Sequence, residues 1–315
     1  MSFVQVRGLG KQYAPDGPKA VDDLSFDIRE GEIFSLLGPN GAGKTTTISI
    51  LSTLLPATSG EAFVSGHSVQ REPMAVRRLI GIVPQDLALY SDLSARENLR
   101  FWGEMRGLSG EQLKREIDEK LALTDLTERA KDRVSTFSGG MKRRLNLAIG
   151  LLGNPPLVIL DEPTVAIDPQ SRRYILDWVK EMNAKGTTVL YTTHYMEEAQ
   201  ELSHRIGIMD HGKLIALGTL AELVQMVGEH ETLILRLQGE ETGEALAAAM
   251  GEAGGVSKAS STNGEVVLNV ESAEEVLPVA LRRATDLGLT IRTVEIREPN
   301  LETVFLHLTG RALRD

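Results

Sequence analysis

One short segment constrains the fold of this 315-residue chain more than any other. Residues 38–45 read Gly-Pro-Asn-Gly-Ala-Gly-Lys-Thr and match the pattern G-x-x-x-x-G-K-[S/T]. The apolar stretch Glu32–Leu37 predicts a strand before this segment, and residues 46–54 predict a helix after it. In this order, a glycine-rich turn directs backbone N–H groups at a polyphosphate, and the helix N-terminus adds partial positive charge. The segment therefore predicts a phosphate-binding loop within an α/β fold.

The chemistry of phosphate binding assigns a part to single positions of this loop. Pro39 has no N–H group, so we expect the donors to come from Asn40 through Thr45. The glycines permit the backbone conformation that such a loop requires. We expect Lys44 to reach the β- and γ-phosphates and the hydroxyl group of Thr45 to bind Mg²⁺.

Two acidic residues follow a second apolar strand. Residues Leu157–Leu160 are continuously apolar, which is typical of a strand buried on both faces of a parallel sheet, and Asp161 and Glu162 come next. Ligands of open α/β sheets bind at the carboxyl ends of the strands, so these carboxylates are expected beside the phosphate loop. We expect Asp161 to bind Mg²⁺ through water and Glu162 to polarise the attacking water.

Short apolar runs alternate with helical patterns up to about residue 220. This alternation predicts an α/β domain with a largely parallel sheet. Residues 94–123 predict a stretch that is helical throughout, with Ser94 as its N-cap and Glu97 three residues later. Further strands are predicted at Phe3–Arg7, Leu24–Ile28, Ile80–Val83 and Thr188–Tyr191.

The pattern changes near residue 230, where strands and helices predict a small α+β domain. We therefore expect a first domain over residues 1–228, with a helical subdomain at about 86–152, and a second domain over residues 229–315. In the second domain, strands are predicted at Thr232–Leu237, Glu265–Val270 and Leu289–Ile296, and helices at Thr242–Met250, Ala273–Leu287 and Leu301–Leu308.

A third motif precedes the acidic strand. Residues 136–145 read Thr-Phe-Ser-Gly-Gly-Met-Lys-Arg-Arg-Leu, and Ser138 is a natural N-cap for a helix whose free N–H groups suit a terminal phosphate. With the phosphate loop and the acidic strand end, in this order, the segment resembles the signature of the ATP-binding-cassette family. The resemblance covers nearly the whole chain and implies a P-loop NTPase cassette with a mixed, largely parallel sheet. It also implies that Ser138–Gly140 complete the ATP site of a second copy of the chain.

The resemblance alone assigns roles to four further residues. Gln85 corresponds to the glutamine that senses Mg²⁺ and the membrane partner, and His194 to the histidine that contacts the γ-phosphate and helps to place the water. Tyr13 lies at the offset of the aromatic residue that stacks on adenine; the alternative is a surface tyrosine at a strand end. Asp168 corresponds to the loop that touches the opposite subunit. The expected catalytic residues are Glu162, His194, Lys44 and Gln85; the nucleotide-binding residues are Tyr13, Gly38, Pro39, Asn40, Gly41, Ala42, Gly43, Lys44, Thr45, Thr46, Ser138, Gly139, Gly140 and Asp168; the Mg²⁺ ligands are Thr45, Gln85 and Asp161.

Three positions depart from the family pattern. Phe137 and Met141 stand where many members have Leu and Gln, although Met141 followed by residues 142–144, Lys-Arg-Arg, is common in one exporter branch. Ala166 replaces the usual small Gly or Ser in the loop of Asp168, which puts the timing between the two ATP sites in question.

The C-terminal segment bears on the function. Residues 299–311 resemble the tail of ATPases from drug-resistance and lipo-oligosaccharide exporters, in which the membrane domain is a separate chain. The resemblance implies an ATPase that binds ATP and Mg²⁺ between two copies of itself and powers export of a drug-like, lipid or glycolipid substrate through a permease. Its expected place is the cytoplasmic face of the cell membrane. An importer ATPase, or a soluble ATPase switch without a permease, is the alternative.

Composition excludes several other classes. The net charge of −10 argues against nucleic acid as the main partner. The chain has no cysteine, so disulfides and thiolate metal sites are excluded. We expect neither a signal peptide nor a membrane span, since no apolar run approaches roughly 18 residues. Tyr90, Phe101 and Trp102 cluster near the predicted helical stretch, where they either pack the subdomain or line a groove for a membrane-domain helix.

Overall fold

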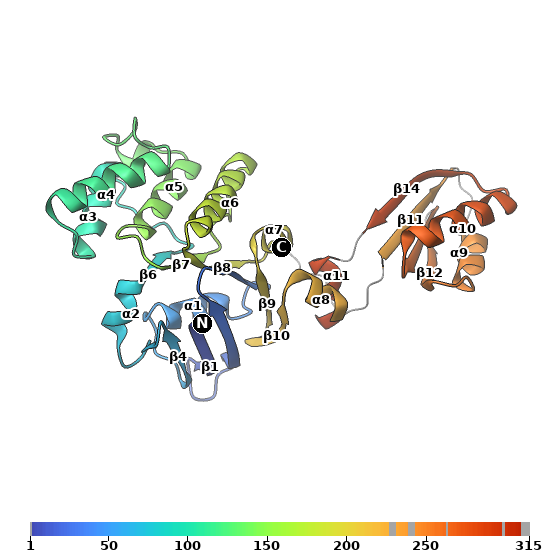
Figure 1. The fold of residues 1–315 in the computed structure, drawn as a ribbon, viewed down its shortest axis with the longest axis horizontal. Helices are drawn as coiled ribbons and strands as arrows, with labels where there is room; N and C mark the ends of the chain where they lie inside the picture. Colours follow the sequence, from blue (N-terminus) through green and yellow to red (C-terminus); the bar gives the residue numbers. More distant parts are fainter. Residues whose placement is uncertain (1, 227–230, 239–242, 263, 298–299, 310–315) are drawn as a thin grey trace. The chain divides into compact units, whose positions relative to one another are not determined.

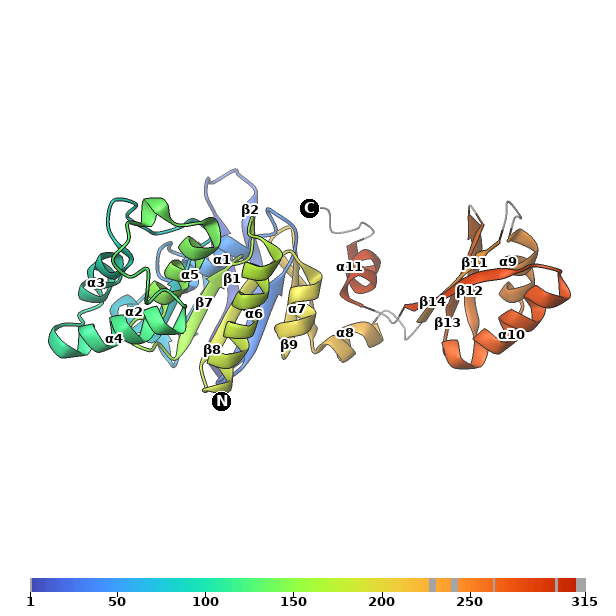
Figure 2. The same cartoon turned by 90° about the horizontal axis from the view of Figure 1, so that it is seen from above.

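The computed structural model describes residues 2–226, 231–238, 243–262, 264–297 and 300–309. The chain divides after Leu220 into two compact units, and each is described by itself (Figures 1 and 2). The domain boundary expected between residues 228 and 229 lies outside the described residues, and the second unit begins at Ala221.

The first unit is built around a sheet with the strand order β10-β9-β3-β8-β7-β6 in the described part of the chain. The strands pair in parallel except β10, which is antiparallel to β9. Strands β3, β7 and β8 are buried along their whole length, as apolar strands covered on both faces are. The strands of this sheet are β3 Ile33–Leu37, β6 Ile80–Val83, β7 Leu157–Asp161, β8 Thr188–Thr193, β9 Arg205–Asp210 and β10 Lys213–Gly218.

A second, antiparallel sheet has the order β2-β1-β4-β5 among the described residues. Helix α1 packs between the two sheets, because Ile48 and Leu51 share one buried cluster with side chains of both. Helix α6 packs on the opposite face of the central sheet through Ile175 and Val179. The elements are β1 Ser2–Gln12, β2 Lys19–Arg29, β4 Ser59–Val64, β5 His67–Ser68, α1 Lys44–Leu51, α2 Pro73–Leu79, α6 Pro169–Ala184 and α7 Met196–Leu202.

Three helices with a buried core of their own form the helical part of the unit, beside α6 in Figure 1. They are α3 Ala95–Met105, α4 Gly110–Leu123 and α5 Gly139–Gly150. The Ser94–Glu97 capping box at the start of α3 is confirmed. The prediction of continuous helix over residues 94–123 was wrong, because Gly107 adopts a φ of 84° and ends α3, and a new helix begins after Ser109.

The second unit contains an antiparallel sheet whose described strands follow the order β12-β13-β11-β14, with α9 and α10 packed on one face. The predicted elements are present, except that residue 242 of the predicted first helix lies outside the described residues. Strand β12 was not predicted, since its sequence Val-Ser-Lys-Ala-Ser-Ser-Thr is mostly polar. The elements are α8 Leu220–Met226, β11 Glu231–Leu237, α9 Glu244–Gly251, β12 Val256–Thr262, β13 Glu265–Val270, α10 Ala273–Asp286, β14 Ile291–Arg297 and α11 Leu301–Thr309.

None of the helices in the described part of the chain combines the length and apolar character that a bilayer span requires.

Candidate active site

The predicted phosphate loop connects β3 to α1, as the sequence indicated. Gly43 caps α1 with a φ of 101°, and a Cβ atom there would collide with the carbonyl oxygen of Ala20. A Cβ atom at Gly38 would collide with the carbonyl oxygen of Met209. Both glycines are therefore required by close backbone approach, and at Gly43 by the left-handed conformation as well.

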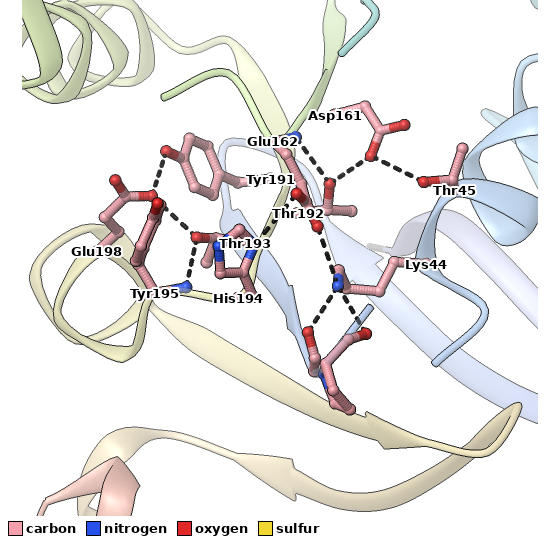
Figure 3. A network of polar contacts seen from close by, with 12 residues as sticks. Lys44, Thr45, Asp161, Glu162, Tyr191, Thr192, Thr193, His194, Tyr195 and Glu198 are labelled. Carbon is pink, nitrogen blue, oxygen red and sulfur yellow. Dashed lines mark hydrogen bonds and ion pairs between the residues drawn. The ribbon is translucent and has the colours of Figure 1, made fainter. Parts of the chain in front are cut away.

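Lys44 is a buried cation of the site, with 4% of its surface exposed. Its Nζ atom donates to the carbonyl oxygens of Gly38 at 2.6 Å and Pro39 at 3.1 Å. The same atom lies 3.0 Å from Oε1 of Glu162 (Figure 3). The ammonium group is thus directed to the inside of its own loop and to the acidic end of β7, where its charge is compensated.

Asp161 lies at the end of β7 and faces the start of α1. Its Oδ1 atom accepts a hydrogen bond from the Thr192 hydroxyl at 2.7 Å and lies 3.5 Å from Oγ1 of Thr45 (Figure 3). Burial raises the pKa of this carboxyl group, and the hydrogen bonds from Thr192 and Thr45 act in the opposite direction. The predicted pair of Thr45 and Asp161 is therefore brought together, with Thr192 fixing the carboxylate.

Glu162 and His194 meet at the ends of adjacent strands. Oε2 of Glu162 lies 3.1 Å from Nδ1 of His194, and the carboxylate is nearly buried. The backbone of Glu162 has a φ of 44°, in the left-handed region that non-glycine residues rarely adopt. Its N–H group donates to both the carbonyl oxygen and the hydroxyl of Thr192, which holds this conformation in place.

Gln85 lies in an exposed loop after β6. Its carbonyl oxygen accepts a hydrogen bond from Nη1 of Arg143 at 2.7 Å. The same guanidinium group donates to the carbonyl oxygens of Pro84 at 3.3 Å and Glu162 at 3.4 Å. Arg143, on α5, therefore connects the loop of Gln85 to the end of β7 through the main chain of both.

The signature segment begins helix α5. Ser138 caps the helix and its hydroxyl accepts from the N–H group of Met141, while Ser138 and Gly139 are exposed. Gly140 is buried, and a Cβ atom there would collide with the Ser171 side chain. Ser171 in turn donates to Asp168, the N-cap of α6, from its hydroxyl at 2.7 Å and its N–H group at 2.9 Å. The signature segment and the loop of Asp168 thus adjoin within one chain.

The remaining predicted residues surround the start of α1. Asn40, Gly41 and Thr45 are exposed, and Ala42 is buried. The hydroxyl groups of Tyr13 and Thr46 lie 3.2 Å apart, and 63% of the Tyr13 surface is exposed. Tyr13 is therefore an accessible ring at the edge of the phosphate loop, as either interpretation of this residue requires.

Two residues to which the sequence analysis assigned no role belong to this site. Thr192 contacts both acidic residues, and Arg143 contacts the backbone of Gln85 and Glu162. A signal for Thr192 was available: it lies two residues before His194 on the strand that pairs with β7, directly opposite Asp161. For Arg143 the available signal was its place in the predicted helix, where a cation lies on the apolar side, next to Arg144.

Comparisons with known proteins identify the family of the chain. The ABC transporter family model matches residues 21–165. The chain is 45% identical to the linearmycin resistance ATP-binding protein LnrL of Bacillus subtilis (strain 168), over 99% of this chain and 100% of that protein. It is 38% identical to the daunorubicin resistance ATP-binding protein DrrA3 of Streptomyces coeruleorubidus, over 98% of this chain and 96% of that protein.

Solved structures give the same result for the fold. A dimeric ATP-binding cassette in a post-hydrolysis state, bound to ADP and Pi, has a TM-score of 0.63 and 28% identity, covering 69% of this chain and 98% of that one. An ATP-binding subunit of an ABC transporter has a TM-score of 0.66 and 30% identity, covering 72% of this chain and 94% of that one. The expected cassette fold is confirmed. The chain therefore belongs to the ABC transporter family and is an ATP-hydrolysing subunit of that family.

Proposed function

We propose that two copies of this chain hydrolyse MgATP at their interface and thereby drive export of a substrate through a separate membrane permease. The observation that carries the hydrolytic part is the contact of Lys44 and His194 with the two oxygens of one carboxylate, Glu162. Phosphoryl transfer to water needs a cation that suits phosphate, a carboxylate and an imidazole, and here Lys44 meets Glu162 and His194 at the ends of two adjacent strands.

Each group has a part in this reaction. Glu162 accepts a proton from the attacking water, and His194, held by the same carboxylate, contacts the γ-phosphate and orients that water. Lys44 stabilises the charge that develops on the phosphate oxygens. Tyr13, exposed at the rim, stacks on the adenine ring.

The residues present fit Mg²⁺. The hydroxyl group of Thr45 and the carboxylate of Asp161 are hard oxygen donors that lie 3.5 Å apart at their closest atoms. Among the described residues no cluster of three or more His, Cys, Asp or Glu forms a metal cage, which suits an ion that takes most ligands from phosphate and water. When bound, Mg²⁺ neutralises charge on the β- and γ-phosphates; Thr45 and Asp161 would hold it, and Gln85 would approach from its loop.

The second copy contributes the signature segment. Ser138 and Gly139 are exposed at the N-terminus of α5, where free N–H groups and the helix dipole favour a phosphate of the partner's ATP. Asp168 is exposed beside them and faces the same partner in this proposal. Each site therefore needs both copies, and release of the γ-phosphate weakens the closed dimer.

The names of the relatives support export. Several are resistance proteins, and one, 36% identical over 94% of this chain, is the Nod factor export ATP-binding protein I of Paraburkholderia xenovorans (strain LB400). Linearmycin, daunorubicin and Nod factor are named for those proteins. For this chain we propose a drug-like, lipid or glycolipid substrate.

A groove of about 390 Å³ on the first unit suits the permease. Pro84, one residue before Gln85, borders it, and Leu54 and Met105 at its rim are 66% and 70% exposed. Tyr90, Phe101 and Trp102 pack against one another nearby, and Trp102 also lines the groove, so both alternatives for this cluster are compatible with its position. We propose that a cytoplasmic helix of the permease inserts its apolar side here and acts on the loop of Gln85, which would place the chain at the cytoplasmic face of the membrane.

A tagged copy purified from detergent-solubilised membranes of the host tests the permease. We expect a multi-pass membrane protein to co-purify and to stimulate ATP hydrolysis when both are reconstituted in vesicles. Accumulation of the substrate inside inverted vesicles would indicate export, and loss from them import. Recovery of the active ATPase with soluble partners alone would contradict the transporter proposal and favour a soluble ATPase switch.

A further inference from the structure

Glu198, on α7, is a buried carboxylate to which the proposed function assigns no contact with nucleotide. Only 2% of its surface is exposed. Its Oε2 atom accepts hydrogen bonds from the hydroxyl groups of Tyr191 at 2.8 Å and Thr193 at 2.9 Å (Figure 3). Both donors lie on β8, so one acidic side chain holds the end of the strand that leads to His194.

Arg172, on α6, provides the opposite charge. Its Nε atom lies 3.4 Å from Oε1 of Glu198, and neither of these two atoms has a hydrogen-bond partner among the described residues. Its guanidinium carbon also lies 4.2 Å from the centroid of the Tyr195 ring, within the range of a cation–π contact. A buried carboxylate requires such a partner, because without Arg172 the charge of Glu198 would be uncompensated.

These contacts fix both neighbours of His194. Thr193, before it, is held by Glu198; Tyr195, after it, donates its N–H group to the Thr193 hydroxyl at 2.9 Å and lies under Arg172. The His194 and Tyr195 rings also pack with their centroids 4.2 Å apart. The imidazole that contacts Glu162 is therefore set between two anchored residues.

Arg172 also belongs to the first turn of α6, whose N-cap is Asp168. The N–H group of Arg172 donates to the carbonyl oxygen of Asp168 at 2.9 Å. Displacement of this turn would move the guanidinium group relative to Glu198 and Tyr195. A physical connection therefore runs from the loop of Asp168 to His194 through Arg172, Glu198 and Tyr195.

We propose that Arg172 and Glu198 are positioning residues that hold His194 against Glu162 and link it to the first turn of α6. The inference rests on the proposed roles of His194 and Glu162 in hydrolysis. It concerns the catalytic step, since Glu198 lies on the side of His194 away from Lys44 (Figure 3).

The test compares two variants, each with a control substitution at an adjacent residue. Glu198→Gln keeps the shape and one acceptor oxygen but removes the charge, and Arg172→Met removes the partner. We expect either variant to lower kcat about 10- to 100-fold, because a small misplacement of a catalytic group has effects of that size, with the KM for ATP within about twofold of the parent. The controls are Glu197→Gln, an exposed neighbour on α7, and Arg173→Met, whose partners Asp177 and Glu201 are on the surface. Neither control should change kcat.

A double-mutant cycle separates positioning from general destabilisation. If the pair acts as a unit, Arg172→Met combined with Glu198→Gln should be no slower than the slower single variant, and Arg172→Lys should restore part of kcat. The concentration of folded sites is counted with a fluorescent ATP analogue, so that kcat refers to competent protein even where a variant folds poorly. If Glu198→Gln fails to fold, the kcat values of Arg172→Met and Arg172→Lys test the inference, since Arg172 is only half-buried.

Two outcomes would overturn the inference: parental kcat per folded site in Arg172→Met, or independent effects that multiply in the double variant. Failure of the proposed function has a different signature, since Glu162→Gln itself would then hydrolyse ATP at the parental rate.

Discussion

Nζ of Lys44 lies 3.0 Å from Oε1 of Glu162, and each side chain has 5% or less of its surface exposed. The two groups that the sequence places more than a hundred residues apart therefore form a buried ion pair, and His194 contacts the other carboxylate oxygen. The carboxylate is held from both sides before it can act on a water, which is the arrangement expected of a group that must keep one orientation.

Glu162→Gln should lower ATP hydrolysis about 10²- to 10⁴-fold, the usual contribution of a general base, while ATP still binds. In the proposed cycle ATP binding closes the dimer and hydrolysis opens it, so the variant should accumulate as an ATP-bound dimer. Gel filtration with ATP and a phosphate-release assay measure the two effects. Glu181→Gln, an exposed residue of α6, serves as the control. Parental hydrolysis in Glu162→Gln would remove this residue from the mechanism.

Thr192→Val should weaken the apparent affinity of the site for Mg²⁺. The variant removes the hydrogen bonds that Thr192 makes with Asp161 and with the N–H group of Glu162. Residues that orient a metal ligand typically contribute about 10- to 100-fold to metal affinity, so the Mg²⁺ concentration for half-maximal hydrolysis should rise within that range. Thr188→Val is the matched control, since this buried threonine lies at the other end of β8 and accepts from Gly31. An unchanged Mg²⁺ titration in Thr192→Val would contradict the assignment of Asp161.

Met105→Glu should leave basal ATP hydrolysis unchanged and abolish stimulation by the permease. The substitution places a charge at the rim of the apolar groove, where an inserted helix would bury it without a partner. Met74→Glu, equally exposed but outside the lining of the groove, should retain stimulation. Co-purification and ATPase assays in vesicles measure both properties, and a normal response of Met105→Glu would exclude the groove as the docking site.

Ser94→Ala should destabilise the helical part of the first unit, because the Ser94 hydroxyl accepts from the N–H group of Glu97 at the start of α3. Loss of such a cap costs about 1 kcal/mol in free energy of unfolding. Hydrogen bonds from Ser94 also lower the pKa of Glu97 below its ordinary value of 4.5. Because the pKa of Glu97 is lower in the folded state, its ionised carboxylate adds to the free energy of unfolding at pH values above the ordinary pKa. This contribution is lost as the pH falls through the folded-state pKa.

Urea unfolding of the parent and of Ser94→Ala at pH 7 and near pH 3 checks this prediction. The difference between the two proteins should be smaller at the lower pH. A difference that grows on acidification would contradict the role of the Glu97 carboxylate in the cap.

Leu268→Ala should destabilise the second unit alone. Leu268 is fully buried in that unit's own core, and such truncations cost about 2–5 kcal/mol. Calorimetry should then show one of two transitions shifted to lower temperature, with basal ATP hydrolysis at the parental rate. Leu281→Ala, on the exposed side of α10, is the control. A shift of both transitions would show that the two units unfold together.

The site was predictable where its functional groups lie in consecutive residues. The phosphate loop, the pair Asp161–Glu162 and the cap Ser138 each follow from a local pattern, and the strands that carry them are short and apolar. Thr192 was not predictable in this way, because a buried threonine is ordinary in a strand and its role depends on the pairing of β7 with β8. Glu198 and Arg172 likewise acquire their contact only when α6 and α7 pack together.

The same distinction applies to the fold. The strand β12 escaped prediction because a polar edge strand lacks the alternation of apolar residues on which such a prediction depends. The break between α3 and α4 was missed because Leu108 and the flanking apolar residues continue a helical pattern across Gly107. For β12 the pairing with β13 decides the outcome. At the helix break, Gly107 and Ser109 are local signals that the apolar pattern obscured.

The contacts of Arg143 have a consequence for the conditions under which the protein works. Its three acceptors are main-chain carbonyl oxygens, which have no proton to gain or lose, and an arginine side chain stays charged at any pH that a cell reaches. The tie between α5, the loop of Gln85 and the end of β7 therefore does not respond to acidification. Any acid sensitivity of the enzyme must therefore enter through other groups, while this tie between α5 and its two neighbours stays constant.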